Sequence, residues 1–183
     1  MLQAKLLNNN DLSAYFHNSF KNAGFANAAD WAAYGGSCLA EGGMLLVDGA
    51  GSGIAVCAYQ QVYTAAAPRQ LYLRCELYVD SLSEAVKALP ASTNNRWAAI
   101  GNGLYPRYDV TGGKQIPEEG GHYLLSGKAV TSAQIFSFGV GAVTSVDMAG
   151  TRLRISRPLL IDLVKYGMEE WTKEQLDTLP WKE

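Results

Sequence analysis

The sequence has little charge and almost no histidine. Asp, Glu, Lys and Arg make up 17% of its 183 residues, there are two histidines, and the formal net charge is −2. A coiled coil would need far more charge, and a disordered chain would have fewer hydrophobic residues than the 48% found here. A nucleic-acid binder would carry a basic stretch, and the sequence has none. We therefore expect a folded domain with no nucleic-acid partner.

Long hydrophobic runs are also missing. A membrane-spanning helix needs about 20 apolar residues, and the run from Ile135 to Val143 is far shorter. The first residues, Met1 to Leu7, lack the apolar segment of a signal peptide and lead directly into three asparagines. We expect no membrane insertion and a protein that is made and folded in a cytoplasm.

Cysteine is scarce and odd in number. Cys38, Cys57 and Cys75 lie far apart in the sequence. In a reducing compartment such residues serve as small buried apolar side chains, and this interpretation is favoured over its alternative, one disulfide and a spare thiol. We expect three free thiols, with Cys75 in the core.

Alternating residues mark the clearest strand. From Leu71 to Asp80 every second residue is apolar, and the residues between are polar or tyrosine. This period of two is typical of a strand with one face in the core and one in water. A second such strand covers 152–156. Less regular candidates are 32–40, 44–48, 54–63, 96–100, 122–126 and 133–140.

Glycine-rich turns separate these strands, and the chain contains 19 glycines and ten tyrosines. Short strands between such turns indicate a sandwich rather than alternating strands and helices. The predicted fold class is all-β, a two-sheet antiparallel β-sandwich (jelly-roll) with two short helices. One helix is expected over 82–89, where Ser81 and Glu84 have the spacing of a capping box, and one over 173–179, where Thr172 and Gln175 do.

The motifs of catalysis are absent. His17 and His122 are far apart and have no metal-ligand spacing, and the segment 49–53 lacks both the lysine of a P-loop and the glycines of a dinucleotide motif. The adjacent carboxylates at 118–119 and 169–170 would point to opposite faces of a strand. Glycosidase carboxylates can still come from distant strands, but nothing here indicates them. We expect no enzyme, no catalytic residues and no metal ligands.

What remains is a binding surface. Tyr72, Arg74, Glu76 and Tyr78 fall on the outward face of the 71–80 strand and combine flat rings with planar hydrogen-bonding groups. These are candidate ligand-binding residues for a sugar. The alternatives are an ordinary exposed sheet face or a contact with a neighbouring subunit. Tyr105 and Tyr108 form a second candidate group on a loop, whereas the nearby Trp97 is expected in the core.

The C-terminal sequence adds a resemblance. The run 157–167 (RPLLIDLVKYG), followed by 168–176 (MEEWTKEQL), resembles the ending of bacteriophage minor structural and tail proteins. That ending has the pattern P-x-L-I-D-L-T, an aromatic–glycine turn, N-E-P-T and a short helix. This chain departs from it at Val164, Glu169 and Trp171. Segments around Asp30-Trp31, 44–47, 59–62 and 71–73 resemble the opening of the same modules more weakly.

The resemblance implies a carbohydrate-binding-like jelly-roll over 30–183, preceded by an N-terminal arm at 1–29 that anchors the module to another virion protein. It implies a structural turn at Asp162, Tyr166 and Gly167, with no cofactor unless a structural calcium ion lies near Asp162. It also implies a virion location, other virion proteins as partners, and homo-oligomers in the assembly. Two functions follow: a module of the tail or adsorption apparatus that binds a host cell-surface glycan, or an architectural protein such as a head fibre, capsid decoration or baseplate component.

Overall fold

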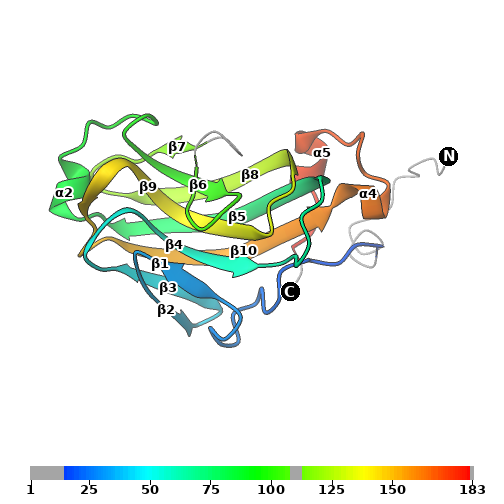
Figure 1. Cartoon of the computed structure of the whole chain (residues 1–183), viewed down its shortest axis with the longest axis horizontal. Helices are drawn as coiled ribbons and strands as arrows, with labels where there is room; N and C mark the ends of the chain where they lie inside the picture. The colour runs from blue at the N-terminus through cyan, green and yellow to red at the C-terminus, as the bar shows by residue number, and fades with distance from the viewer. Residues whose placement is uncertain (1–14, 108–112, 182–183) are drawn as a thin grey trace.

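The computed structural model describes residues 15–107 and 113–181, which form two five-stranded antiparallel sheets packed face to face (Figure 1). The β4–β9 sheet has the order β1 (Ala32–Tyr34), β4 (Ser52–Gln61), β9 (Ile135–Asp147), β6 (Arg96–Gly101) and β7 (Lys114–Gln115). The β5–β10 sheet has the order β2 (Gly36–Glu41), β3 (Met44–Gly49), β10 (Arg152–Asp162), β5 (Arg69–Ser81) and β8 (Gly121–Thr131). The predicted fold class is confirmed.

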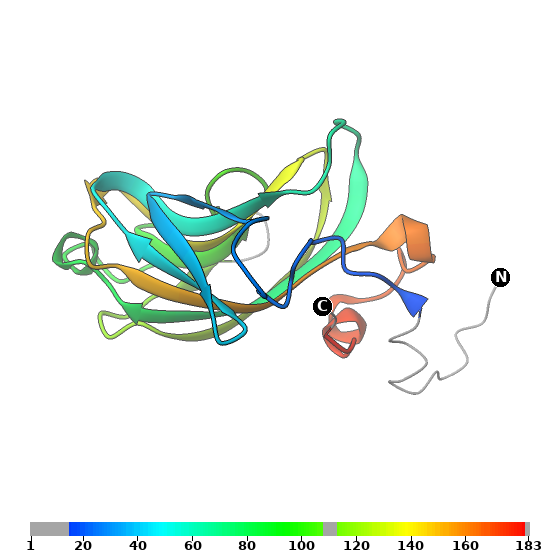
Figure 2. The ribbon, with the colours of Figure 1, turned by 90° about the horizontal axis from the view of Figure 1, so that it is seen from below.

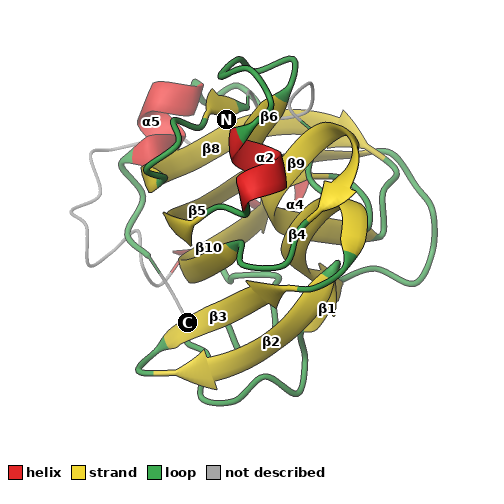
Figure 3. Cartoon of the chain, turned by 90° about the vertical axis from the view of Figure 1, so that its left-hand side faces the viewer, coloured by secondary structure: helices red, strands yellow, loops and turns green. Residues whose placement is uncertain are grey.

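The strand order is that of a jelly-roll. If β3 to β10 are counted as strands one to eight, the β5–β10 sheet runs 1-8-3-6 and the β4–β9 sheet runs 2-7-4-5. This is the order that two interlocked Greek keys produce. Strand β1 is an additional edge strand of the β4–β9 sheet, and β2 is an additional edge strand of the β5–β10 sheet. Figure 3, which looks along the sandwich from the end that carries helix α2 (Glu84–Lys87), shows the two layers side by side.

The core lies between the layers. The alternation predicted for β5 is confirmed, because Leu71, Leu73, Cys75, Leu77 and Val79 are all at most 3% exposed and belong to one hydrophobic cluster. Facing residues from the other sheet complete it: Val56, Ala58, Ile100, Phe136, Phe138 and Val140. Each fully buried side chain of this size contributes about 1.5–3 kcal/mol to folding. The core therefore fixes which side of β5 faces outward.

The predicted strand at 32–40 is two strands, because Gly35 sends the chain from one sheet to the other. Gly35 has φ +72°, and a Cβ there would lie 2.0 Å from the carbonyl oxygen of Ala55. Only glycine fits such a position without strain. Strand β1 consequently pairs with β4, and β2 pairs with β3. The two-residue strand β7 was not predicted because it is too short to show a period.

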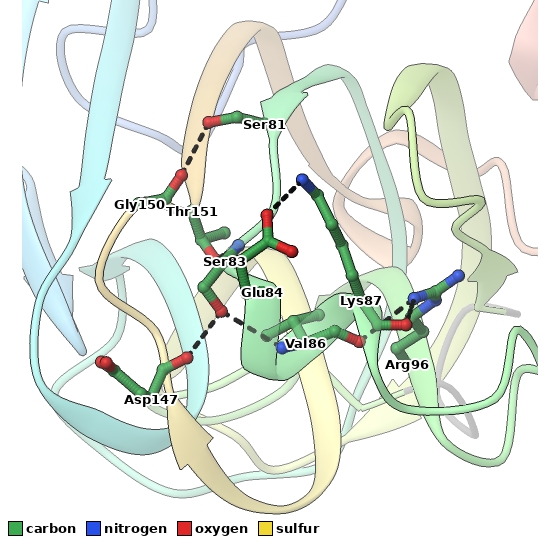
Figure 4. Close-up of polar contacts among 9 residues, drawn as sticks. All are labelled: Ser81, Ser83, Glu84, Val86, Lys87, Arg96, Asp147, Gly150 and Thr151. Carbon is green, nitrogen blue, oxygen red and sulfur yellow. Dashed lines mark hydrogen bonds and ion pairs between the residues drawn. The ribbon is translucent and has the colours of Figure 1, made fainter.

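Helix α2 (Glu84–Lys87) is shorter than the predicted 82–89, and its N-cap is Ser83 rather than Ser81. The Ser83 hydroxyl accepts from the amide of Val86 and donates to the carbonyl of Asp147, whereas Ser81 donates to Gly150 (Figure 4). The proposed Ser81–Glu84 capping box is therefore wrong.

The C-terminal helix α5 (Lys173–Asp177) has the predicted capping box between Thr172 and Gln175, which is confirmed. Helix α4 (Leu163–Tyr166) was not predicted. It follows β10 directly, so its one turn reads in the sequence as a continuation of the strand. None of the helices in the described ranges has the length and hydropathy of a membrane span.

The packed domain begins before residue 30. Residues 1–14 of the predicted arm lie outside the described residues, but Phe20, Ala23 and Phe25 are buried in the main core. The amide of Ser19 donates to the carbonyl of Leu160 at 2.9 Å, which ties this segment to β10. The predicted boundary at 30 is therefore too late.

The cysteines give a direct test of this core. All three are free, and Cys57 and Cys75 are buried, as predicted for Cys75. Burial raises the pKa of each thiol, most strongly for these two, so neither forms thiolate near neutral pH. We expect a thiol reagent to label at most Cys38 in the native protein and all three cysteines after denaturation. Fewer than three thiols after denaturation without oxidant would contradict the structure.

Candidate binding site

The C-terminal segment covers half of the outer face of the β5–β10 sheet. Residues from the helices α4 and α5 pack on this face and form a second hydrophobic cluster with Phe16, at the end of the sandwich seen at the right of Figure 2. The buried members are Phe16, Tyr72, Leu159, Ile161, Leu163, Met168, Leu176 and Leu179. The other half of the face, around Glu76 and Tyr78, stays open.

This cover corrects part of the sequence prediction. Tyr72 is fully buried, and its hydroxyl donates to Asp177 Oδ1 at 2.7 Å. Burial and the neighbouring Asp177 raise the pKa of Tyr72, so it remains a donor. Arg74 is 8% exposed and donates to the carbonyls of Asp177 at 2.9 Å and Leu179 at 3.0 Å. Both side chains point outward as predicted, but the expectation that they are exposed is wrong.

The open half contains two adjoining hollows. The larger, about 510 Å³, is bounded by the sheet, the N-terminal loop, the β2–β3 turn and Trp181. Its lining residues are Gly24, Gly43, Met44, Glu76, Tyr78, His122, Ser156, Arg157 and Trp181. The smaller, about 250 Å³, shares Glu76, Arg157 and Trp181 with it. We call the two together the β5–β10 groove.

A bulge in β10 places Arg157 in this groove. Leu153 and Ile155 point into the core, so simple alternation would send residue 157 there too. The pairing of β10 with β5 shifts its register between Ser156 and Leu159, and Arg157 has φ +52°. This left-handed conformation costs a non-glycine residue about 1–2 kcal/mol. The bulge turns a guanidinium that would otherwise be buried toward the open face.

Glu76 is the centre of the groove's hydrogen bonds. Its carboxylate accepts from Arg157 Nη1 at 3.1 Å, Ser156 Oγ at 3.1 Å and Tyr78 Oη at 3.2 Å. Burial alone would raise the pKa of Glu76, but the bond from Ser156, the charge of Arg157 and the bond from Tyr78 lower it below the ordinary value. Glu76 is therefore ionised at neutral pH, and it fixes three side chains that line the groove.

A stack of two rings lies beside this network, and its exposed side is the His122 ring. The rings of Tyr78 and His122 stack with centroids 4.2 Å apart and planes 4° apart. The guanidinium of Arg154 lies 5.0 Å from the Tyr78 ring centre and is held by two 2.7 Å bonds to Asp80. The charges of this face are thus paired, Glu76 with Arg157 and Asp80 with Arg154.

The second predicted group lies elsewhere. Tyr105 belongs to a loop against the outer side of the β4–β9 sheet, where its ring contacts Tyr34 at 5.7 Å and Arg107 at 5.3 Å. Tyr108 lies outside the described residues. Trp97 is buried at 9% exposure, as predicted. The structure therefore separates Tyr105 from the groove at Tyr78.

Several groove residues were missed. His122 lies opposite Tyr78 in the β5–β8 register, so pairing the two predicted strands would have found it. The sequence gives a weaker indication of Arg157: the proline that follows it interrupts the strand pattern. Trp181 had none, because only the folded C-terminal segment brings it here.

Near the end of β10 the residues have structural contacts. The Asp162 side chain accepts from the Lys165 amide as the N-cap of α4, and Gly167 ends that helix with φ +65°. The Tyr166 hydroxyl accepts from the amide of His17. Among the described residues no group of three or more His, Cys, Asp or Glu side chains could hold a metal ion. Calcium at Asp162 stays a prediction.

Comparisons with known proteins give distant likenesses of fold. No family model matches the sequence, and no curated protein does. Among solved structures, the second N-terminal cellulose-binding domain of a Cellulomonas fimi β-1,4-glucanase C is 14% identical with a TM-score of 0.40, covering 80% of this chain and 95% of that one. A mutant of CBM29-2, a family 29 carbohydrate-binding module, in complex with cellohexaose is also 14% identical, with a TM-score of 0.41 and coverages of 80% and 89%. The jelly-roll assignment rests on the strand pairing above.

Proposed function

We propose that this chain is a non-catalytic glycan-binding module and that it holds a neutral sugar in the β5–β10 groove. The observation that carries the proposal is the juxtaposition of the Tyr78–His122 stack with the Glu76–Ser156–Arg157 network. A sugar ring presents C–H groups on its faces and hydroxyls around its edge. It therefore fits a site with an aromatic surface and a few fixed polar groups.

The polar groups suit hydroxyls in particular. The hydroxyls of Ser156 and Tyr78 give their protons to Glu76, which leaves their oxygens free to accept from a ligand. Arg157 uses one nitrogen for Glu76, has a side chain 60% exposed, and offers further N–H donors. Because the charges are paired, the groove favours a neutral glycan over an acidic one.

The same geometry argues for binding without hydrolysis. Glycosidases act with two carboxyl groups, one of them protonated at the working pH. Among the described residues that line the groove, Glu76 is the only carboxylate, and its lowered pKa keeps it ionised. Three donors already occupy it. This supports a role for Glu76 in holding the site in shape.

We propose further that the module belongs to a bacteriophage virion and sits in the tail or adsorption apparatus, where it contacts host surface glycans. The support is the sequence resemblance of residues 157–176. A single shallow site would bind with a dissociation constant on the order of 0.1–1 mM. Homo-oligomers alongside other virion proteins would raise the avidity by about 10²–10⁴.

A purely architectural virion role is the second candidate. The observation that favours it is exposed apolar surface on both edge strands of the β5–β10 sheet. Leu39 on β2 is 62% exposed and Val130 on β8 is 75% exposed. Open strand edges with apolar side chains pair readily with other chains. In that role these edges, rather than the groove, would contact partners.

The glycan proposal is tested by replacing the stacking ring. In affinity gel electrophoresis we expect the wild-type protein to be retarded by at least one of four neutral polysaccharides, hydroxyethylcellulose, xylan, galactomannan and dextran, and not by anionic polygalacturonate. We expect Tyr78→Ala to weaken that retardation about tenfold, roughly 1.4 kcal/mol, because the variant loses a side chain that lines the groove and supports the His122 ring.

Tyr59→Ala is the matched control. Tyr59 is a partly exposed tyrosine of β4, in the opposite sheet, and its removal should leave retardation unchanged. If none of the four polysaccharides nor a glycan array binds the wild-type protein, the glycan proposal fails and the architectural one gains. Equal loss in both variants would remove the groove from consideration.

A further inference from the structure

Trp181 has a place in the groove that the β-sheet alone does not explain. It is the last described residue, and its side chain lines both hollows together with Glu76 and Arg157. It is therefore the one aromatic side chain common to the two hollows within the described part of the chain. Any ligand that extends from one hollow to the other passes its indole.

The indole nitrogen of Trp181 is unused. Nε1 is buried from solvent and has no hydrogen-bond partner among the described residues. A buried donor without an acceptor costs about 1–3 kcal/mol, and such groups in native proteins call for a specific explanation. A turn of the side chain toward the groove would bring Nε1 to a ligand hydroxyl, which would supply the acceptor.

The backbone just before Trp181 is held in place by the rest of the fold. Arg74, which is nearly fully buried, donates to the carbonyl of Leu179, two residues before the tryptophan. Pro180, between them, restricts the backbone further. Leu179 itself is buried in the second hydrophobic cluster. The fold thus already orders the backbone that leads to Trp181, so a ligand does not have to meet that part of the conformational cost.

We infer that Trp181 is a ligand-binding residue of the β5–β10 groove: its ring stacks on a sugar unit, and its Nε1 donates to a hydroxyl of that sugar. The inference rests on the proposed glycan function and adds a second aromatic contact to the Tyr78–His122 stack. Arg74, which itself lines the smaller hollow, also holds the segment that carries Trp181. The site therefore binds neutral oligosaccharides that span both hollows.

The test uses three variants and the neutral polysaccharide that most retards the wild-type protein among the four named above. We expect Trp181→Ala to weaken binding tenfold or more. Trp181→Phe keeps a ring but removes the N–H, and we expect a loss of about fivefold. Trp171→Phe is the matched control, since Trp171 lies on the same segment but does not line either hollow, and it should bind like the wild type. Thermal unfolding checks that each variant is folded.

Tryptophan fluorescence gives an independent measurement. Titration with the same polysaccharide should change the emission of the wild type and of Trp171→Phe, and this change should be lost in Trp181→Phe. The inference is overturned if both Trp181 variants bind like the wild type while Tyr78→Ala loses binding. If the wild type binds none of the polysaccharides, the proposed function has failed instead.

Discussion

Replacing Arg96 by methionine is expected to lower the free energy of unfolding by about 3–5 kcal/mol, the largest stability effect we predict. Arg96 is 1% exposed, which makes it one of the largest fully buried side chains of the protein. Within the described residues it has no ion-pair partner. Its charge is stabilised by carbonyl groups instead.

Three carbonyls depend on this guanidinium. Nε donates to Ile116 at 2.8 Å, and Nη1 donates to Val86 at 3.1 Å and Lys87 at 2.7 Å, the last two at the end of α2 (Figure 4). Methionine would fill much of the volume but leave the carbonyls of Ile116 and Lys87 without this donor, while the Val86 carbonyl would keep only the Leu89 amide. Each unsatisfied buried group costs about 1–3 kcal/mol. Arg96 thus ties α2 and the loop before β8 to the β4–β9 sheet.

Chemical denaturation measures this change directly, and the thermal midpoint should fall by roughly 6–20 °C for a protein of this size. Arg152→Met is the matched control. Arg152 pairs with Asp48 at the surface, with its side chain 61% exposed, so its loss should change stability little. An Arg96→Met variant as stable as the control would show that the three carbonyls find other partners or water.

The sequence predicted the sides of β5 but not what covers them. Alternation from Leu71 to Val79 states which residues face the core, and the structure confirms it. On the outer face, Tyr72 and Tyr78 are equivalent by period, yet one is fully buried and the other borders a groove. The difference comes from a segment about 100 residues later in the chain, whose Asp177 bonds to Tyr72. A local pattern carries no information about such a contact.

The position of the α2 cap shows the same limit in the helices. Ser81 and Ser83 are both good N-cap residues, and the glutamate three residues after Ser81 favoured Ser81. In the fold, the amide of Ser83 donates to the Thr151 hydroxyl and the Ser83 hydroxyl donates to Asp147. These contacts come from the region where β9 ends and β10 begins. Tertiary contacts therefore decide which of the two serines caps α2. At Thr172 no such competitor is present, and the local motif was sufficient.

The prediction for the N-terminal segment was wrong for a different reason. Phe16, Phe20 and Phe25 enter hydrophobic clusters from irregular backbone, without strand or helix period. Periodicity identifies buried residues only inside regular elements. Arg157 is the corresponding case within a strand, because a bulge reverses the alternation where β10 borders the groove. Both the start of the domain and half of the site therefore depend on irregular backbone.

Glu76→Gln is expected to weaken glycan binding about 10- to 100-fold at neutral pH. Hydrogen bonds to a charged group contribute about 1.5–3 kcal/mol, and the carboxylate receives three of them, from Tyr78, Ser156 and Arg157. A glutamine keeps one accepting oxygen but replaces the other by an NH2 group, whose N–H donors would face either Arg157 or the Ser156 and Tyr78 hydroxyls. Arg157, whose left-handed backbone places it beside this carboxylate, would lose its ion pair. Glu84→Gln, on the exposed helix α2, is the matched control and should bind like the wild type.

The pH dependence separates this role from general destabilisation. The pKa of folded Glu76 is lowered from 4.5, so the carboxylate's contribution to stability is fully present above 4.5, the unfolded value, and is lost as the pH falls through the lower folded pKa. The contribution of Glu76 to wild-type binding should therefore stay constant from pH 7 to about 4.5 and decline only below it. Glu76→Gln has no such group to titrate, so its weaker binding should not follow this decline. A variant that binds like the wild type at pH 7, with unchanged thermal unfolding, would show that the Glu76 network does not shape the ligand site.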